Sequence, residues 1–302
     1  MKRTVAGNVA HTSDILRKRT VGEKIIFAVI FVLFVVYALV LIVPILWLLI
    51  NSFKSNLEYY DSISNATPFA WPKNFKFLNY AKAFSMFQYG DSTFWDMLFN
   101  SVWYVLIVTA EGVFFSACTG YVMSKYKFRG RGFIYSVAIV SMTIPIVGSL
   151  GASFKLSYDL GIYDTPLQPL LSCAGGFGFN FLILYAFYKS VPWSYSEAVF
   201  IDGGNHFTAF FKVMLPMAVA PMTTLAIMSA IGAWNDYSSV ILFLPDFPTI
   251  AAGLYLVKSD LIKESMPVYF AQLIISMIPI IVVFSVFSEK IMTNLSVGGL
   301  KG

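Results

Sequence analysis

Charged residues are scarce in this sequence of 302 residues. Asp, Glu, Lys and Arg make up 12% of it, against about 25% in an average soluble domain, whereas hydrophobic residues make up 58%. A soluble protein needs more polar surface than this to cover an apolar core, so the composition excludes a soluble enzyme and a disordered chain. We therefore expect an integral membrane protein.

Cysteine and histidine are rarer still, with two of each. Cys118 and Cys173 both lie in apolar runs, which excludes a secreted disulfide scaffold and predicts buried free thiols. His11 lies in a basic N-terminal arm and His206 in a polar loop, so we expect both at the surface and neither in a metal or catalytic site. The sequence also lacks the Gly-rich phosphate-binding loop with its Lys, so this chain is not expected to hydrolyse ATP.

Long uncharged runs indicate how often the chain crosses the membrane. A helix needs about 20 apolar residues to cross a hydrocarbon core about 30 Å thick. The stretch from Thr249 to Val257 is too short, so we expect it to be interfacial or re-entrant. Six runs are long enough, and their continuous apolar character indicates helices rather than barrel strands. They cover residues 25–53, 97–124, 132–154, 165–188, 213–235 and 265–288.

The positions of Lys and Arg predict the orientation. If the N-terminus is cytoplasmic, the inner segments hold 14 of these residues and the outer segments hold 7. We expect a cytoplasmic arm at 1–24, a single six-span domain at 25–288 and a cytoplasmic tail at 289–302. The first run is longer than the core of a signal peptide, so we expect it to stay in the protein. The net charge of +5 then reflects topology and contact with anionic lipid rather than nucleic-acid binding.

The loop between the fourth and fifth runs is the most informative segment. Ser194 or Ser196 is placed to cap a short helix whose early turn holds Glu197, and Asp202 with the two glycines after it ends that helix. A second short helix is predicted to start near Asn205. Such an elbow, with small residues at its tip, suits docking to another protein.

This loop resembles the EAA loop of bacterial ATP-binding-cassette (ABC) importer permeases. Glu197-Ala198-Val199 and Asp202-Gly203 are followed after eleven residues by Leu215-Pro216, as in that family, although Val199 stands where a second Ala is usual. Further likenesses extend over nearly the whole chain and together resemble the MalG-type carbohydrate permeases. They are Asn51-Ser52-Phe53-Lys54, Trp71-Pro72, Asn79-Tyr80, Asn100-Ser101, residues 121–130, Trp234-Asn235-Asp236 and the C-terminal Gly298-Gly299-Leu300-Lys301-Gly302.

The resemblance implies an all-α permease of type I, MetI-like architecture in a bacterial cytoplasmic membrane, with both termini inside. Its implied partners are a second, MalF-like permease, two ABC ATPase subunits that bind ATP-Mg, and an extracytoplasmic solute-binding protein for a sugar or oligosaccharide. This chain itself is then expected to be non-catalytic and to hold no cofactor or metal. The loop at 190–212 is implied to couple to the ATPase. The implied contacts are Glu197, Ala198, Asp202, Gly203, Leu215 and Pro216 in the coupling segment, and Gly298, Gly299, Lys301 and Gly302 in the tail.

Several residues leave alternatives open. Glu111 is the only ionisable residue within a run; it is either part of the transport path or a structural residue, protonated or paired with a hydroxyl such as that of Thr109 or Ser116. Asn235 and Asp236, beside aromatic residues, either meet sugar hydroxyls or cap a helix end. Glu197 is alternatively a solvated acid favoured at a helix start, and the tail a frayed terminus.

Prolines within the runs are candidate hinges, because each removes an internal hydrogen bond and permits a kink. These are Pro145, Pro221 and Pro279. Among other functions, a secondary transporter would need more intramembrane charges, and a membrane enzyme would need a catalytic constellation that the runs lack. An ABC permease for a non-sugar solute is the nearer alternative, and the sequence names no particular sugar.

Overall fold

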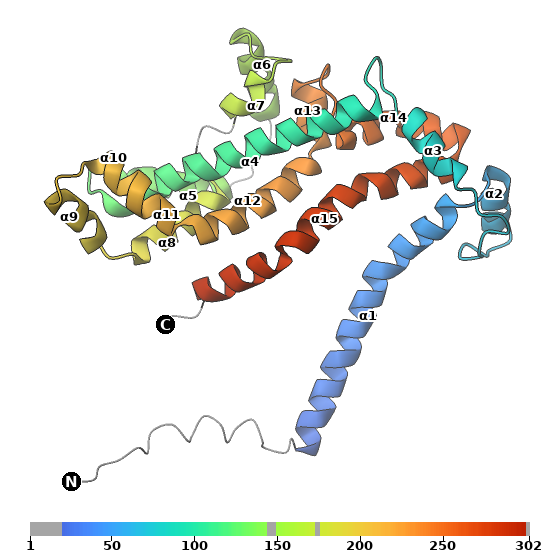
Figure 1. Ribbon diagram of the computed structural model, residues 1–302, viewed down its shortest axis with the longest axis horizontal. Coiled ribbons are helices and arrows are strands. Elements are labelled where there is room, and N and C mark those ends of the chain that lie inside the picture. Colours follow the sequence, from blue (N-terminus) through green and yellow to red (C-terminus); the bar gives the residue numbers. More distant parts are fainter. Residues whose placement is uncertain (1–19, 144–148, 173–175, 300–302) are drawn as a thin grey trace. The chain divides into compact units, whose positions relative to one another are not determined.

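The computed structural model describes residues 20–143, 149–172 and 176–299 (Figure 1). The described residues form helices and no β-strand. The chain divides into two units, one ending at Phe75 and the other beginning at Lys76.

The first unit contains α1 (Val21–Ser52) and α2 (Asn56–Ser64). The start of α1 is fixed by a capping box: Glu23 N–H donates to Thr20 Oγ1 at 3.3 Å and Thr20 N–H donates to Glu23 Oε2 at 2.7 Å. The apolar side chains of α1 are exposed along most of its length, as expected for a helix that faces lipid. The side chain of Lys54 is fully buried after α1, and its Nζ donates to Ser62 Oγ at 3.1 Å.

The second unit is built around α4, which begins with Thr93 and Asp96 in a second capping box. Figure 1 shows α4, α12 and α15 running along this unit, with α4 packed on α8 and α12, and α15 packed on α12, α14 and α3. The helices are α3 (Leu78–Ser85), α4 (Phe94–Lys125), α5 (Arg131–Thr143), α6 (Ser149–Asp159), α7 (Leu167–Ser172), α8 (Phe179–Ser190), α9 (Ser194–Ile201), α10 (His206–Thr208), the wide π-helical turn η2 (Ala209–Met214), α11 (Leu215–Met217), α12 (Val219–Trp234), α13 (Tyr237–Phe243), α14 (Ile250–Glu264) and α15 (Met266–Gly299).

A glycine allows α4 and α8 to approach closely. A Cβ on Gly120 would lie 3.0 Å from the backbone nitrogen of Tyr185 and 3.2 Å from the carbonyl carbon of Leu184. Any larger residue at this position would push the two helices apart. The contact brings the chain just before the elbow against the last third of α4.

Polar side chains fix the other end of α4. Ser101 Oγ accepts a hydrogen bond from Ile250 N–H at 2.8 Å, and Asn100 Nδ2 donates to the carbonyl of Pro248 at 3.1 Å. These bonds satisfy backbone groups at the start of α14. The stretch from Thr249 to Val257, predicted to be interfacial or re-entrant, thus forms the first part of a helix that packs on α4, α13 and α15.

Three helices in the described ranges are long and apolar enough to cross a membrane. They are Val21–Ser52, Phe94–Lys125 and Met266–Ser288, and a fourth span results if the bent pair His206–Met217 and Val219–Trp234 is counted as one. The predicted third and fourth spans are represented by shorter helices, α5 to α8, separated by 144–148 and 173–175, which lie outside the described residues. The count of six therefore stays a prediction.

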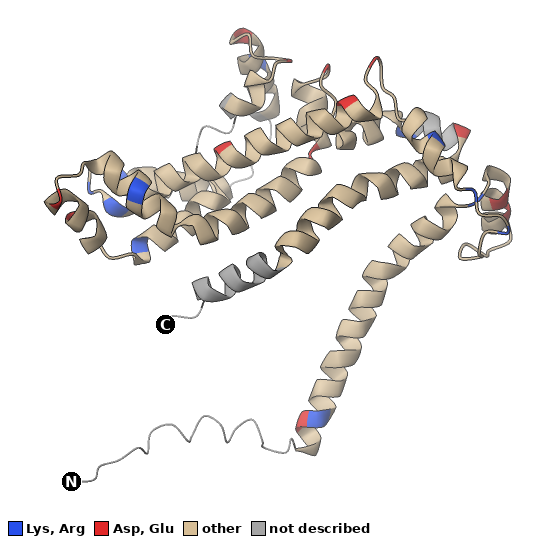
Figure 2. Cartoon of the chain, viewed as in Figure 1, with Lys and Arg blue, Asp and Glu red and all other residues tan. Residues whose placement is uncertain are grey.

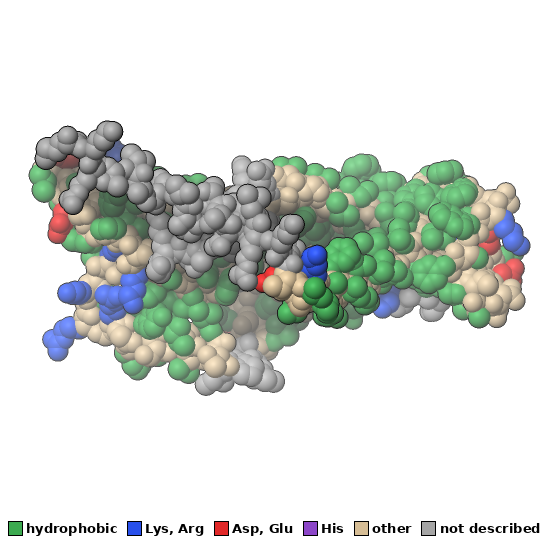
Figure 3. Space-filling view, turned by 90° about the horizontal axis from the view of Figure 1, so that it is seen from below, with side chains coloured by type: hydrophobic (Ala, Val, Ile, Leu, Met, Phe, Trp, Pro, Cys, Tyr) green, Lys and Arg blue, Asp and Glu red, His purple; other side chains and the backbone are tan. Residues whose placement is uncertain are grey.

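Charged residues are unevenly distributed along the second unit. Figure 2 shows Lys and Arg gathered at the end that carries α9 and α10, and few charges along the long helices. Figure 3 shows hydrophobic side chains over much of the described surface that faces the viewer, α1 included. This distribution is typical of a membrane domain with one basic interface.

The three predicted hinge prolines have different positions. Pro279 lies inside α15. Pro221 lies in the first turn of α12, directly after the break at which the bent pair His206–Met217 and Val219–Trp234 changes direction by 70°, so the fifth span is kinked beside this proline. Pro145 lies outside the described residues.

Candidate functional site

The predicted elbow forms as two short helices, α9 and α10, after α8. The expectation that Ser194 or Ser196 caps α9 was wrong. Trp193 occupies the cap position without a side-chain hydrogen bond, and both serines lie inside the helix. The backbone carbonyl of Trp193 accepts the bonds of the first turn instead. Ser196 N–H donates to it at 2.9 Å and Glu197 N–H at 3.2 Å. Glu197 is in the first turn, as predicted.

The two glycines end α9 in a Schellman motif. Gly203 has φ +80°, Gly203 N–H donates to the carbonyl of Phe200 at 3.1 Å, and Gly204 N–H donates to the carbonyl of Val199 at 2.8 Å. Asn205 then starts α10, because its side chain accepts a hydrogen bond from Thr208 N–H at 2.8 Å. The turn is thus specified by its own sequence, and the predicted second helix near Asn205 is confirmed.

Val199, the departure from the usual EAA pattern, packs inside the elbow. A Cβ on Gly204 would lie 2.5 Å from Val199 Cγ1 and 2.9 Å from the Val199 carbonyl oxygen. Val199 is only partly exposed, whereas a Cβ on Gly203 would meet nothing within 4 Å. The added branch therefore fills space between α9 and the turn, and it leaves the tip open.

The predicted coupling residues separate into two groups. Glu197, Ala198, Asp202 and Gly203 are all exposed on the elbow. Leu215 is partly buried and packs on the cluster beneath the elbow, and Pro216 is exposed in α11. The structure thus presents a small exposed surface with two carboxylates and two residues that lack long side chains.

The prediction that Leu215 and Pro216 fix the start of the long fifth helix was wrong. They follow the wide turn η2, and the chain bends by 70° between Met217 and Val219, so that α12 begins three residues after Pro216. Pro216 has no N–H to continue the preceding helix, which is consistent with a wide turn and a break here. The elbow is therefore separated from α12 by a bend.

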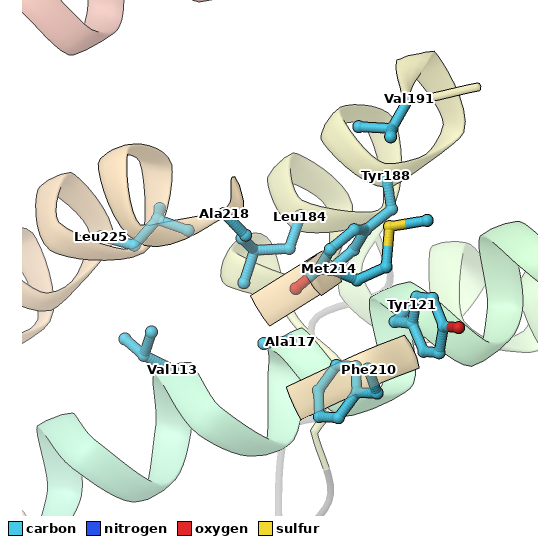
Figure 4. Packing of buried hydrophobic residues seen from close by; sticks show 10 residues of the cluster. All are labelled: Val113, Ala117, Tyr121, Leu184, Tyr188, Val191, Phe210, Met214, Ala218 and Leu225. Atoms are coloured by element: carbon cyan, nitrogen blue, oxygen red, sulfur yellow. The ribbon is translucent and has the colours of Figure 1, made fainter. Parts of the chain in front are cut away.

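A buried cluster lies beneath the elbow and joins four parts of the chain. Figure 4 shows its side chains converging from α4, α8, η2 and the start of α12. Tyr121, from α4, packs its ring against Phe210 of η2 at a centroid distance of 5.0 Å and against Tyr188 of α8 at 5.6 Å. The cluster consists of Val113, Ala117, Tyr121, Leu184, Tyr188, Val191, Phe210, Met214, Ala218 and Leu225.

Two polar contacts attach the end of α4, one to the elbow and one to the end of α8 just before it. Tyr126 Oη lies 2.9 Å from His206 Nδ1, and the Tyr126 ring also packs edge-on against His206 and Trp193. Lys125 Nζ donates to the carbonyl of Val191, the residue that ends α8. Burial, together with the hydroxyl of Tyr121, raises the pKa of Tyr126, which therefore stays protonated as a hydrogen-bond donor.

Sequence reasoning missed this attachment. His206 was predicted only to be at the surface, which is confirmed, and the link to Tyr126 was not predicted. The two residues are 80 positions apart, so no local spacing could indicate the contact. An aromatic residue directly after a predicted span, on the same side as the elbow, was the available signal.

Asn235 and Asp236 serve as helix-end residues. Asn235 Nδ2 donates to the carbonyl of Ile231 at 2.8 Å at the end of α12. Asp236 Oδ1 accepts from Ser239 N–H at 3.0 Å and so caps α13, while its Oδ2 accepts from Tyr104 Oη at 3.1 Å. The capping interpretation is confirmed for Asp236.

Glu111 is 94% buried in the interior of α4, with 6% of its surface exposed. Neither of its carboxylate oxygens accepts a hydrogen bond in the part of the chain that the structure describes, and Thr109 Oγ1 is likewise unsatisfied there. The predicted pairing with Thr109 or Ser116 is therefore not formed within this chain. A buried acid without a partner is costly, so the position of Glu111 needs an explanation beyond the packing of this chain.

The remaining predicted sites lie at the edge of what is described. Gly298 and Gly299 are the last residues of α15, and Lys301 and Gly302 lie outside the described residues. Cys118 is a partly buried free thiol, and Cys173 lies outside the described residues. In the described ranges no three His, Cys, Asp or Glu residues come together as metal ligands.

Known proteins share this arrangement of helices. A crystal structure of a bacterial ABC transporter involved in the import of the acidic polysaccharide alginate contains a chain that matches with a TM-score of 0.73 and 24% identity, over 90% of this chain and 98% of that one. At this identity the likeness shows the fold, which is that of an ABC importer permease.

Curated relatives match over nearly their whole length. The diacetylchitobiose uptake permease NgcG of Streptomyces coelicolor is 30% identical over 88% of this chain and 86% of its own. The trehalose transport permease SugB of Mycobacterium tuberculosis is 28% identical over 91% of this chain and 97% of its own. The arabinooligosaccharide permease AraQ of Halalkalibacterium halodurans is 25% identical over 89% of this chain and 94% of its own.

The family match covers the elbow and the bundle around it. Residues 112–292 match the family described as the inner membrane component of binding-protein-dependent transport systems. Such permeases are non-catalytic, since separate subunits hydrolyse ATP. The chain thus belongs to this family of inner-membrane components and is a multi-pass permease subunit of an ABC importer.

Proposed function

We propose that this permease imports a sugar or oligosaccharide and forms half of the translocation path. The relatives with named substrates carry diacetylchitobiose, trehalose, arabinooligosaccharides and sulfoquinovosyl glycerol, all of which contain sugar units. In this proposal a second, MalF-like permease forms the other half and an extracytoplasmic solute-binding protein delivers the sugar. Both termini face the cytoplasm, as the excess of Lys and Arg favours.

We infer that the elbow docks on one of two ABC ATPase subunits, which bind ATP-Mg. One observation carries this inference: Glu197, Ala198, Asp202 and Gly203 are exposed together on an elbow whose base is packed into the bundle. The open space around Gly203 leaves room for a partner surface. Gly298, Gly299, Lys301 and Gly302 at the tail are proposed as a further contact with the ATPase.

The substrate path is proposed to pass Glu111, because a buried, unpartnered carboxylic acid retains hydrogen-bonding capacity for a sugar hydroxyl. Asn235 and Asp236 are weaker candidates, since their side chains already bond to the backbone at helix ends. Glu111→Gln keeps a hydrogen-bonding group without the acid. It is expected to change the apparent KM for sugar uptake without changing ATPase assembly.

Uptake and ATPase assays on the whole importer test the docking. Glu197→Ala is expected to leave the permease in the membrane but to uncouple ATP hydrolysis from uptake. Asp159→Ala is the matched control, because Asp159 is also an exposed acid and pairs with Lys155 of the same helix, α6, at 3.1 Å. Wild-type uptake and full ATPase assembly in the Glu197 variant would rule out the docking role.

The substrate class has its own test. The solute-binding protein that co-purifies with the importer is screened by thermal shift against sugars, oligosaccharides and amino acids. Stabilisation by a sugar supports the proposal. Stabilisation by an amino acid alone would make the chain a permease for a non-sugar solute while leaving its membership of the family intact.

A further inference from the structure

A groove opens beside the elbow, between the end of α4 and the segment formed by α10 and η2. Its volume is about 410 Å³, which is within the usual size range of small-molecule sites. Its walls are almost entirely apolar. They are formed by Cys118, Tyr121 and Val122 of α4 and by Phe207, Phe210 and Phe211 of the opposite segment.

Several of the wall residues are exposed. Phe207 is 74% exposed, Phe211 49% and Val122 43%. The rings of Phe210 and Phe211 lie with their centroids 5.0 Å apart, so the wall on the η2 side is a rigid aromatic surface. A hydrocarbon chain fits such an open, apolar groove better than a compact polar ligand does.

The groove lies where the apolar run of α4 ends, which is the level of a membrane interface. Tyr126 and His206 stand at its rim. The hydroxyls of Tyr121 and Tyr126 are 3.2 Å apart, and Tyr126 Oη is 2.9 Å from His206 Nδ1. An occupant of this groove thus meets apolar walls and polar groups at one side, which suits an amphipathic molecule.

The two segments that form the groove carry charge of one sign, while the acids Glu197 and Asp202 lie on the neighbouring α9. Residues 121–131 and 206–217, which flank it, contain five Lys and Arg and no Asp or Glu. Lys127, Arg129 and Lys212 are exposed. Lys212 follows the wall residue Phe211 directly, and Lys127 follows the rim residue Tyr126. Basic pockets between membrane helices at this level favour anionic lipid headgroups.

We propose that this groove binds an anionic phospholipid, with an acyl chain against the phenylalanine wall and the headgroup phosphate near Lys212 and Lys127. The site involves residues of the elbow itself, so a bound lipid would stabilise the position of α10 against α4. Neither the sugar nor the ATPase contact enters this inference.

Photolabelling of the complete importer in nanodiscs tests the site. The probe is phosphatidylglycerol with a diazirine in its acyl chain, compared with phosphatidylcholine that carries the same group. Labelling at residues 118–122 and 207–211 is expected to be several-fold stronger with phosphatidylglycerol. Removing one cation with Lys212→Gln is expected to reduce that preference about fivefold. Leu106 of α4 is 64% exposed and lies outside the groove, so it serves as the control for nonspecific contact with lipid. It should label equally with both lipids in every variant.

Two results would overturn the proposal. One is equal labelling of the groove by the two lipids. The other is a protein adduct formed by a photoreactive residue in place of Val122, which would show that a partner chain covers the groove. Val122→Trp, which fills the groove from an exposed position, is expected to abolish the preferential labelling while the signal at Leu106 persists.

Discussion

Tyr126 Oη lies 2.9 Å from Nδ1 of His206, and this contact joins the end of α4 to the start of α10. The elbow thus follows α8 in the chain, is joined to α12 through a bend of 70°, and is attached to α4 through Tyr126. The attachment through Tyr126 is a side-chain connection from the elbow to α4, in addition to the two chain connections.

Removal of the Tyr126 hydroxyl tests that connection. Tyr126→Phe keeps the ring contacts with Trp193 and His206 but loses a hydrogen bond that contributes about 1 kcal/mol. We expect normal assembly and ATP hydrolysis but a lower ratio of sugar transported to ATP hydrolysed. Tyr158→Phe, at an exposed tyrosine of α6, is the control and should leave the ratio unchanged. An unchanged ratio in Tyr126→Phe would mean that α4 does not receive the movement.

The two glycines of the elbow should respond differently to substitution. Gly203→Asn places a side chain where φ is +80° and nothing lies within 4 Å, and Asn tolerates this conformation. We expect the thermal stability of the isolated permease to change little while ATPase assembly falls, because the new side chain projects only toward a partner. Loss of stability without loss of assembly would contradict the docking assignment.

Gly204→Ala is the structural counterpart. The new Cβ would lie 2.9 Å from the backbone oxygen of Val199, which cannot move without disturbing the end of α9. The expected cost is about 1–3 kcal/mol, seen as a lower unfolding temperature of the purified permease. An unfolding temperature equal to that of the native chain would show that the elbow is less tightly packed than these contacts indicate.

Asp236 joins α12, α13 and α4, and its two bonds can be separated. Asp236→Asn retains an oxygen that can cap α13, whereas Asp236→Ala removes both bonds and is expected to cost about 1–2 kcal/mol of stability. Tyr104→Phe removes only the bond to Asp236 Oδ2. A thermal double-mutant cycle of Tyr104→Phe and Asp236→Ala should show coupling of about 1 kcal/mol. Additive effects would show that the bond between them contributes nothing.

We expect the stability of the folded protein to depend on pH through the carboxyl of Asp164. Burial raises the pKa of its carboxyl, and the nearby carboxyl of Asp246 raises it further. The Asp246 N–H, which donates to Asp164 Oδ1 at 3.1 Å, acts in the opposite direction without cancelling the rise. The folded state thus favours the protonated form, so ionisation at neutral pH destabilises it, and stability returns as the pH falls through the raised pKa. Asp164→Asn is expected to raise the unfolding temperature at pH 7, with the gain shrinking in mildly acidic buffer. A gain that is independent of pH would contradict this.

The sequence predicted the elements whose signals are local. The capping and turn residues of the elbow, Asn205 and Gly203 among them, specify its shape within a few positions, and the long apolar runs specify α1, α4 and α15. Glu197 and Asp202 are exposed as the resemblance implied, although their contact with an ATPase stays a prediction.

What the sequence could not predict depends on contacts between distant residues. The link between Tyr126 and His206 and the bond between Tyr104 and Asp236 join residues 80 and 132 positions apart, so both require the fold to be known. The start of α12 was misplaced because a proline permits a helix start at several positions, and the wide turn before Pro216 leaves no pattern in apolar spacing.

The most direct test of coupling is a photoreactive residue in place of Ala198, activated in native membranes that contain the whole importer. Ala198 is exposed on α9 between the two carboxylates. We predict an adduct with the ABC ATPase subunit whose yield changes when ATP is added, and no such adduct from the same group in place of Tyr158. Adducts with lipid alone at position 198, with the ATPase present in the same membranes, would contradict the assignment of this elbow as the coupling site.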